Sequence, residues 1–520
     1  MRVKNRISYF LLKWLIVNHN RSQFYILLFI GFPLISISQI NFLKTAKTNI
    51  GLGLNLSTSG ETPFWIRSNQ NGTVPFKSNY LAFNFSSHSE YDSLYNKNQK
   101  LNKLGIGYGL STYIFSKNEI RNFVLAEAYA KVRFSKLEFF AGRRNEFVGL
   151  VDSTLSSGSF AWSGNSLPIP QVKLHIPNFI PLIGKGLISF KGSFSHGWYG
   201  SQNYLKNVQL HHKSLYFKLG RPSWKINFYG GFNHQVQFGG ELQKLKKLSS
   251  IKNGEIPSSF IDYIYAVTGV SLGNSKNQSK VDIDGYTGYD LTNRIGNHFG
   301  SIDVAMNIFT KFGTFYIYRQ SVYDDGSLFY LINLSDGLSG ISFKPLKTRV
   351  FNKIVLEFFN SKSQGGHIGP IETQNAYLRG QDDYFNHGQF IDGWSNKYFT
   401  SGTPFISPQL YVKDEFKLYV NSVSADIPYG YFTSNNRVNA IYLNLALNVL
   451  NSDLNLIYSH SSNLGTYRHP FQKSINQNCS MIQIKKQLLN KMKFRVNISF
   501  DDNGIFNNTL GTLISLQKEL

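Results

Sequence analysis

The stretch Trp224–Phe238 reads WKINFYGGFNHQVQF and alternates between two kinds of side chain. Its even-numbered positions are mostly apolar or aromatic, whereas its odd-numbered positions carry Lys, Asn, Tyr, Gly and Gln. Successive side chains of a β-strand point to opposite faces, so the pattern predicts a strand with one apolar and one polar face. At about 3.3 Å per residue, this strand is long enough to cross a bilayer while tilted.

The same alternation recurs along the rest of the chain, with turn-forming residues between the runs. The clearest further runs are residues 50–56, 104–111, 188–198, 441–449 and 494–501. Clusters of Gly, Pro, Asn, Asp and Ser separate neighbouring runs, for example at residues 220–223, 451–453 and 501–504. The chain therefore reads as a series of strands joined by turns.

A soluble β-sandwich also alternates, so other observations must decide between a sandwich and a membrane barrel. Many candidate strands exceed the usual ~5–6 residues. Their polar faces are rich in Asn, Ser, Gly, Tyr and Lys, as in a wet lumen, and aromatic residues lie near many strand ends. We predict an all-β fold, a single transmembrane antiparallel β-barrel of about 16–18 strands.

Composition agrees with this fold class. Of the 520 residues, 16% are charged, below the ~25% typical of soluble domains, and 15% are aromatic. No segment after the N-terminal region approaches the ~20 consecutive apolar residues of a spanning helix. The single cysteine, Cys479, excludes an internal disulfide and a zinc site built on several thiolates.

The N-terminus has the layout of a secretory signal peptide. An apolar run, Phe24–Ile37, follows a basic region, and Ser36 and Ser38 stand at the −3 and −1 positions of a cleavage site before Gln39. We predict a signal peptide at residues 1–38 and a barrel at 39–520, with an uncleaved anchor as the alternative. The basic residues are Arg2, Lys4, Arg6, Lys13 and Arg21.

The chain is basic, with a formal net charge of +24, and removal of the signal peptide leaves about +19. One explanation places lysines on loops and barrel rims near anionic lipid head groups. Another is a basic surface that meets an acidic polymer. Nucleic acid is not an expected partner, because the chain is exported and carries no recognition-helix or RNP pattern.

Four long irregular insertions interrupt the strands, at residues 149–181, 241–261, 273–299 and 365–407. Loops beyond ~15 residues are usually functional or disordered. We expect these insertions to fill part of the lumen, and residues 260–270 to form a short helix within a loop.

The sequence contains no HExxH, Walker loop or GxGxxG between a strand and a helix. A GxSxG match at residues 269–273 follows the expected short helix and not a strand, so it lacks the context of a catalytic serine turn. His211 and His212 are adjacent on a predicted strand, so their rings point to opposite faces and do not favour a metal site. Calcium binding is an alternative at residues 324–326 and 382–383, although Asp and Gly there suit tight turns better. We predict no catalytic residue, metal or cofactor, with a lipase-type Ser/His/Asn arrangement as an unmarked alternative.

One insertion carries a recognisable sequence. Gly142-Arg143-Arg144 is followed by GLVDSTLSSGSFAWSGN at residues 149–165 and by Leu-Pro-Ile-Pro at 167–170. This resembles the capsule-assembly Wzi family of outer-membrane proteins. Further segments that resemble the family, in the same order along the chain, are residues 62–65, 190–198, 230–235, 319–328 and 436–439.

The resemblance implies an 18-stranded outer-membrane barrel that anchors capsular or other exported polysaccharide in a lectin-like manner, without enzymatic activity. Better-known members carry a small periplasmic helical bundle before the barrel. Here only residues 40–49 separate Gln39 from the first predicted strand, so we expect that bundle to be missing or moved. Expected partners are surface polysaccharide and outer-membrane lipid, and the expected state is a monomer.

Sugars present hydroxyls and flat apolar faces, so a sugar site needs amides, hydroxyls and aromatic rings together. We expect Arg143 and Arg144 to attract acidic polysaccharide. The alternative is structural, since the insertion can plug the lumen and brace the wall. The polar and aromatic candidates for the site are Asp152, Ser153, Thr154, Ser157, Trp162 and Asn165, together with Trp198, Arg319, Tyr323 and Asp324.

A competing function is a passive outer-membrane channel or transporter for small or apolar substrates. It requires an open lumen and ion conductance, and the bulky insertions argue against both.

Overall fold

The computed structural model describes the chain from residue 46 onward, and residues 46–520 form one compact unit. The predicted signal peptide, 1–38, lies outside the described residues. The described ranges are 46–91, 104–116, 122–243, 251–273, 275–281, 285–287, 290–291, 294–324, 333–347, 350–366, 382–418, 432–502 and 504–520.

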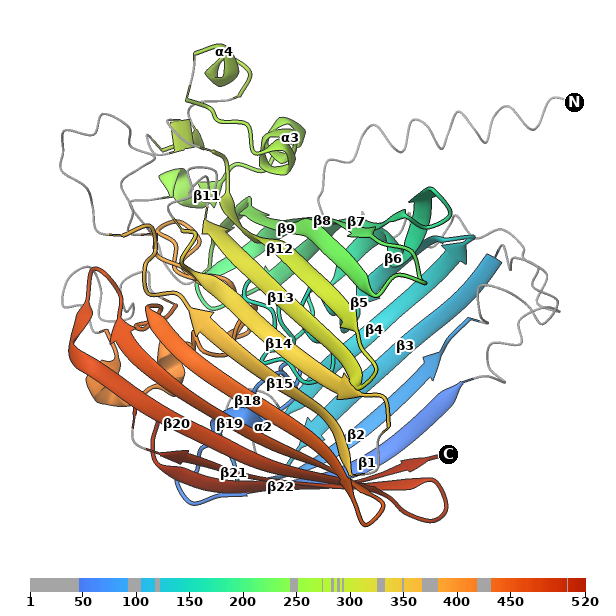
Figure 1. The fold of residues 1–520 in the computed structure, drawn as a ribbon. Helices are drawn as coiled ribbons and strands as arrows, with labels where there is room; N and C mark the ends of the chain where they lie inside the picture. Colours follow the sequence, from blue (N-terminus) through green and yellow to red (C-terminus); the bar gives the residue numbers. More distant parts are fainter. Residues whose placement is uncertain are drawn as a thin grey trace, which may run out of the picture. The chain divides into compact units, whose positions relative to one another are not determined.

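Eighteen long antiparallel strands form a closed barrel (Figure 1). Each strand pairs with the next along the chain, and β1 closes the ring by pairing with β22 as well as with β2. The prediction of a single antiparallel barrel, with 18 strands favoured, is confirmed. The strands are β1 (Lys47–Ser57), β2 (Tyr80–Ser89), β3 (Leu104–Phe115), β4 (Phe123–Phe134), β5 (Leu137–Arg143), β6 (Gln171–Ile183), β7 (Ile188–Ser201), β8 (Leu205–Leu219), β9 (Ile226–Phe238), β12 (Asn297–Phe309), β13 (Gly313–Asp324), β14 (Gly337–Pro345), β15 (Phe351–Asn360), β18 (Val438–Val449), β19 (Ser452–Gly465), β20 (Pro470–Gln487), β21 (Met492–Asp502) and β22 (Thr509–Glu519).

The two rims of the barrel differ in the length of their connections. Short turns such as 135–136, 184–187 and 310–312 join strands at one rim, here called the turn-side rim. Connections such as 58–79, 144–170 and 361–437 join strands at the opposite, loop-side rim. In bacterial outer-membrane barrels the short turns face the periplasm and the longer loops face outward.

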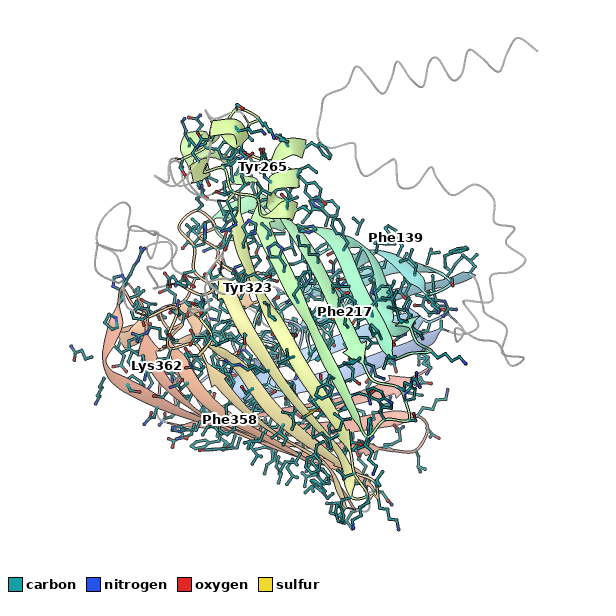
Figure 2. All side chains as sticks on the ribbon, turned by 45° about the horizontal axis from the view of Figure 1, so that its top comes forward. Phe139, Phe217, Tyr265, Tyr323, Phe358 and Lys362 are labelled. Carbon is teal, nitrogen blue, oxygen red and sulfur yellow. The ribbon has the colours of Figure 1, made fainter. Side chains whose placement is uncertain are left out.

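The alternation in the sequence corresponds to the two faces of the barrel wall. Phe139, Phe217 and Phe358 project from the outer surface and are 40%, 42% and 50% exposed (Figure 2). On the opposite face of β9, the side chains of Asn227 and Asn233 point into the lumen and are buried. The interpretation of Trp224–Phe238 as a two-faced strand is therefore confirmed, although β9 begins at Ile226.

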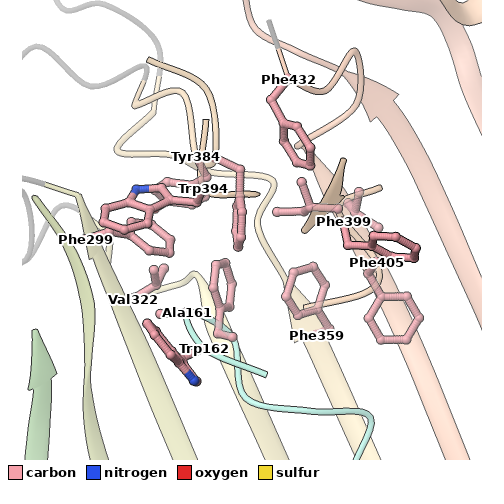
Figure 3. Packing of buried hydrophobic residues seen from close by; sticks show 14 of the residues in the cluster. Ala161, Trp162, Phe299, Val322, Phe359, Tyr384, Trp394, Phe399, Phe405 and Phe432 are labelled. Atoms are coloured by element: carbon pink, nitrogen blue, oxygen red, sulfur yellow. The ribbon is translucent and has the colours of Figure 1, made fainter. Parts of the chain in front are cut away.

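Loops from the loop-side rim enter the lumen and pack there. We call residues 58–79, 144–170 and 382–418 together the plug. Phe160 of the plug is fully buried, with its ring centroid 4.9 Å from Phe359 of β15 and 6.2 Å from Phe299 of β12. Figure 3 shows Tyr384 and Trp394 beside Phe299 in the same cluster. Each buried aromatic of this kind contributes roughly 1.5–3 kcal/mol, so the cluster fastens the plug to the wall.

Short elements lie within the plug segments. The helix α2 (Phe64–Arg67) belongs to the connection after β1, and a small hairpin belongs to the connection after β15. The remaining short elements of that last connection are β16 (Ser395–Asn396), β17 (Phe399–Thr400), η7 (Gln409–Tyr411) and η8 (Asp414–Phe416).

Two predicted insertions are shorter than expected. The first, 149–181, overlaps β6, because Gln171–Ile183 pairs with both β5 and β7. Pro177 and Pro181 lack the N–H that a sheet ladder uses, so they interrupt the register, and the strand lacks a clean alternation in the sequence. The third, 273–299, overlaps the start of β12 at Asn297.

The connection between β9 and β12 carries the short helix expected near residues 260–270. It is α3 (Phe260–Thr268), and a capping box between Ser259 and Asp262 fixes its first turn. Its Ala266 packs on Val236 and Phe238, which are fully buried although they lie on the outward face of β9. The other elements of this connection are β10 (Gly240–Leu242), η3 (Lys252–Gly254), β11 (Glu255–Ile256) and α4 (Ser275–Gln278). Among the described residues, no helix has the length and apolar character needed to cross a membrane.

Candidate functional site

The predicted polar residues of the first insertion lie in the plug, and most are buried. Gly142 directs the chain into the lumen: its φ is +122°, and a Cβ there would lie 2.2 Å from the carbonyl oxygen of Ala128. Only glycine adopts this backbone without strain. Beyond it, Ser153 and Thr154 are exposed, whereas Asp152 and Ser157 are buried.

Asp152 and Ser157 are held by protein groups from distant strands. Asp152 forms an ion pair with Lys353 of β15 at 2.5 Å and accepts hydrogen bonds from the backbone and hydroxyl of Thr154. The backbone N–H of Ser157 donates to Glu357 at 2.8 Å. Burial alone would raise the pKa of the Asp152 carboxyl, but Lys353 and Thr154 lower it below its ordinary value. Asp152 therefore carries its charge at neutral pH and fastens the plug to β15.

Trp162 and Asn165 are also enclosed by protein. The Trp162 ring stacks on His212 of β8, with centroids 4.9 Å apart and planes 11° from parallel. The side-chain oxygen of Asn165 accepts from the N–H of Asn69 at 2.8 Å. The space beside Trp162 and Arg144 has a volume of about 20 Å³, enough for one water molecule and too small for a sugar.

The two predicted arginines bind the wall. Arg143 donates to the carbonyl oxygen of Leu125 at 2.6 Å, and Arg144 forms an ion pair with Glu138 of β5. Burial lowers the pKa of Arg144, but Glu138, together with Tyr129 and Glu146, raises it above its ordinary value. Both side chains therefore stabilise the point where the chain leaves the wall.

The other predicted residues lie on or above the outer wall. Trp198 of β7 is 42% exposed on the outward face. Arg319 of β13 donates to the carbonyl oxygens of Leu334 and Asp336, and the Tyr323 hydroxyl donates to the carbonyl oxygen of Asn233. Asp324 ends β13 at the loop-side rim. The wall separates Trp198, Arg319 and Tyr323 from the plug, so the predicted residues do not form one site.

A different cavity opens at the loop-side rim, with a volume of about 340 Å³. We call it the rim cavity. Three segments meet there: the β7–β8 connection, residues 391–398, and residues 408–418 with Phe432. Its lining residues are Gln202, Asn203, Tyr204, Ile391, Asp392, Ser395, Tyr398, Pro408, Gln409, Leu410, Lys417, Leu418 and Phe432.

Hydrogen bonds fix the polar lining of the rim cavity. The Asp392 carboxylate accepts from the backbone N–H groups of Asn203, Tyr204 and Leu205 at 2.8–3.2 Å. The Tyr398 hydroxyl donates to the side-chain oxygen of Asn203 at 2.8 Å. The β7–β8 connection is thereby joined to the plug, and the amide and aromatic groups of the lining have a defined geometry.

His387 stabilises the backbone just before residues 391–398 of the plug. Its Nδ1 accepts from the backbone N–H groups of Gln389 and Phe390 at 3.1 and 3.2 Å. Burial lowers the pKa of His387 to about 4, so the ring is neutral at physiological pH and free to accept both bonds.

Sequence reasoning did not identify the residues of the rim cavity. Residues 391–398 fall inside the predicted insertion 365–407, but Asn203 and Tyr204 occupy a short turn with no distinguishing pattern. One signal in the sequence could have found them: amide and aromatic residues occur together within 202–204 and again within 394–398. Within the described ranges, no three His, Cys, Asp or Glu side chains group to hold a metal ion.

The fold can be compared with known structures. The chain superimposes on an Escherichia coli outer-membrane barrel with a TM-score of 0.54 and 10% identity, over 93% of this chain and 86% of the other. That barrel is Wzi, and this chain is similar to it in fold. Wzi is described as an outer-membrane protein involved in group 1 capsule assembly and as a carbohydrate-binding β-barrel.

A more distant similarity is to OccK5 (OpdH) of Pseudomonas aeruginosa, with a TM-score of 0.43 and 9% identity over 92% of this chain and 99% of that one. No protein-family model and no curated protein matches the sequence.

Proposed function

We propose that this protein is a non-enzymatic outer-membrane barrel that binds exported surface polysaccharide, such as capsule, in a lectin-like manner at the rim cavity. The observation that carries this proposal is the rim cavity itself. Its volume of about 340 Å³ lies within the usual range of ligand pockets. It lies at the loop-side rim, where an exported polymer would meet an outer-membrane barrel.

The lining of the rim cavity suits a sugar. Tyr204, Tyr398 and Phe432 offer aromatic faces for apolar sugar C–H groups. The amides of Gln202 and Asn203 also line the cavity, and bonds to Asn396, Lys397 and Tyr398 hold them in place. Amides both donate and accept hydrogen bonds, as sugar hydroxyls do. Lys417 is paired with Asp414 at 2.6 Å, and Asp392 also lines the cavity, so the lining does not by its charge favour an acidic polymer. The carbohydrate-binding description of Wzi supports the same class of ligand.

The plug supports a binding role over a channel. The aromatic cluster around Phe160 ties the first insertion to β12 and β15, and Tyr384 and Trp394 extend it from the connection after β15. The apolar contacts of such a cluster do not favour the passage of hydrated solutes. The predicted residues of the first insertion then support the surface on which the polysaccharide lies.

The test is binding of the host's own surface polysaccharide to the purified, refolded mature protein in detergent. We expect saturable binding by wild type, and an affinity about tenfold weaker for Tyr398→Ala and Asn203→Ala, since each loses a packed or hydrogen-bonded contact. Tyr467→Ala is a matched control, because its hydroxyl bonds to the Ser363 carbonyl and it does not line the cavity.

Absence of binding by wild type would overturn the proposal. Steady single-channel conductance of the same preparation in a planar bilayer would then favour the channel. Equal affinities for wild type, Tyr398→Ala and Asn203→Ala would instead place the polysaccharide elsewhere on the surface.

A further inference from the structure

A second cavity lies on the opposite side of the plug and has a volume of about 200 Å³. We call it the underside cavity. Its wall comes from β6, β7 and β8, and its ceiling is the plug segment 144–149. Lys191 lies only four positions after the β6–β7 turn, so the cavity lies in the half of the lumen nearer the turn-side rim.

Most charged side chains around the underside cavity are held in direct ion pairs, and Lys191 is an exception. Lys173 is paired with Glu146, while Arg144 and His175 share Glu138. Lys191 has no ion pair and no hydrogen bond within the described part of the chain. Its ammonium lies 5.1 and 5.2 Å from the ring centroids of Phe179 and Tyr216. Asp303 attracts this ammonium from a greater distance, but its carboxylate accepts hydrogen bonds from Leu150 and Gln320. Lys191 is therefore a cation that a ligand carboxylate can pair with directly.

The ceiling and the wall add groups that recognise a sugar ring. Phe147 points out of the plug with 51% of its surface exposed, although aromatic side chains elsewhere in the plug are mostly buried. Asn145 is exposed beside it and presents a side-chain amide. On the wall, the hydroxyls of Ser193 and Ser214 lie 2.8 Å apart and line the same space.

We propose that the underside cavity is a second saccharide site, which binds a carboxylate-bearing sugar unit from the turn side of the plug. The carboxylate pairs with Lys191, the sugar ring lies against Phe147, and the hydroxyls bond to Asn145 and the serine pair. This deepens the proposed function, because the same polymer would be held on both sides of the plug. The exposed ring of Phe147 distinguishes the site from one for inorganic phosphate, because phosphate has no apolar face to pack on it.

The experiment measures binding of trigalacturonic acid to the full mature chain in detergent by titration calorimetry, with maltotriose as the neutral probe. We expect tighter binding of the acid, and weaker binding as salt rises from 0.05 to 0.5 M. Lys191→Gln should weaken binding of the acid about tenfold, whereas Lys191→Arg should retain it, since a charge-assisted bond is lost only in the first. Phe147→Ala should weaken it several-fold.

Controls separate this site from the rim cavity and from misfolding. Heat-modifiable migration on a gel confirms that each variant is a folded barrel. Tyr398→Ala, at the rim cavity, should bind the trisaccharide as wild type does. Inorganic phosphate should compete only weakly.

The proposal is overturned if Lys191→Gln binds trigalacturonic acid as wild type does, or if phosphate competes as strongly as the acid while Phe147→Ala has no effect. These outcomes are distinguishable from failure of the proposed function. If wild type fails to bind host polysaccharide but binds the acid in a Lys191-dependent manner, only the proposed function fails. If rim variants abolish polysaccharide binding while Lys191→Gln changes nothing, only the underside site fails.

Discussion

Trp162 of the plug stacks on His212 of the barrel wall, with ring centroids 4.9 Å apart and planes 11° from parallel. The two residues come from the first insertion and from β8, and both are buried. His212 in turn bonds through Nε2 to the side-chain oxygen of Asn233 on β9 at 2.7 Å. The plug is therefore joined to two adjacent strands through a single imidazole.

Trp162→Ala should loosen the plug. We expect a loss of about 3–5 kcal/mol in the free energy of unfolding, the usual cost of deleting a large buried aromatic side chain. The measurement is urea unfolding in lipid vesicles, followed by gel migration. Trp162→Phe serves as control, since it keeps an aromatic ring over His212 and should lose less. Equal stabilities for Trp162→Ala and wild type would show that the stack is dispensable.

Lys353→Met should leave the buried carboxylate of Asp152 without its ion-pair partner. Removing one partner of a buried ion pair typically lowers the free energy of unfolding by about 3–5 kcal/mol. Because Lys353 is partly exposed, we expect a loss near the lower end of that range. The double variant with Asp152→Asn should recover part of the loss, because no unpaired charge remains. If the double variant is less stable than Lys353→Met, the ion pair is not the reason for the effect.

The same pair predicts a pH dependence. The pKa of Asp152 is lower in the folded protein than its ordinary value near 3.8. Its contribution to stability is therefore complete above that ordinary value and is lost as pH falls through the folded pKa. Thermal unfolding at pH 6 and pH 3 should show a smaller acid-induced drop for the double variant than for wild type. An identical drop in both would assign the acid sensitivity to other carboxyls.

His387 predicts a second pH dependence, at the rim cavity. Burial lowers its pKa to about 4, below the ordinary 6.5, so its contribution is complete above pH 6.5 and declines as pH falls toward 4. Protonation of Nδ1 removes the acceptor for Gln389 and Phe390, and so loosens the segment that carries Asp392. Polysaccharide affinity of the folded protein should fall as pH drops through about 4, where His387 becomes protonated.

The control for that pH dependence is His387→Asn, whose side-chain oxygen can accept the same two bonds without titrating. Its affinity should change less over this pH range than that of wild type. A wild-type affinity that stays constant as pH falls from 7 to well below the pKa of about 4 would contradict the role given to His387.

Asp392→Asn should disorganise the rim cavity. An amide has one acceptor oxygen where the carboxylate has two, so one of the three N–H groups at residues 203–205 loses its partner. An unsatisfied group costs about 1–3 kcal/mol, which corresponds to a drop in polysaccharide affinity of roughly five- to a hundredfold. Glu519→Gln, at the turn-side rim, is a charge-matched control and should bind normally. Unchanged affinity for Asp392→Asn would exclude the β7–β8 connection from the site.

The sequence alone was sufficient for the barrel. The alternation in Trp224–Phe238 depends only on neighbours along one strand, because every second side chain shares a face. The alternation did not predict the strand Gln171–Ile183, because Pro177 and Pro181 interrupt its ladder. The sequence also identified residues 149–165 as a segment that resembles a known family. It left open whether these residues bind sugar or fill the lumen.

Only the tertiary structure decided which polar residues line an open cavity and which are enclosed by protein. Trp162 and Asn165 have the chemistry of a sugar site, but His212, Asn69 and the neighbouring strands enclose them. Asn203 and Tyr398 meet at the rim although 195 positions separate them in the chain. Strand periodicity is a local property that a sequence displays directly. Contacts between distant loops depend instead on how the whole barrel closes and on what its lumen can hold, and no short stretch of residues encodes that.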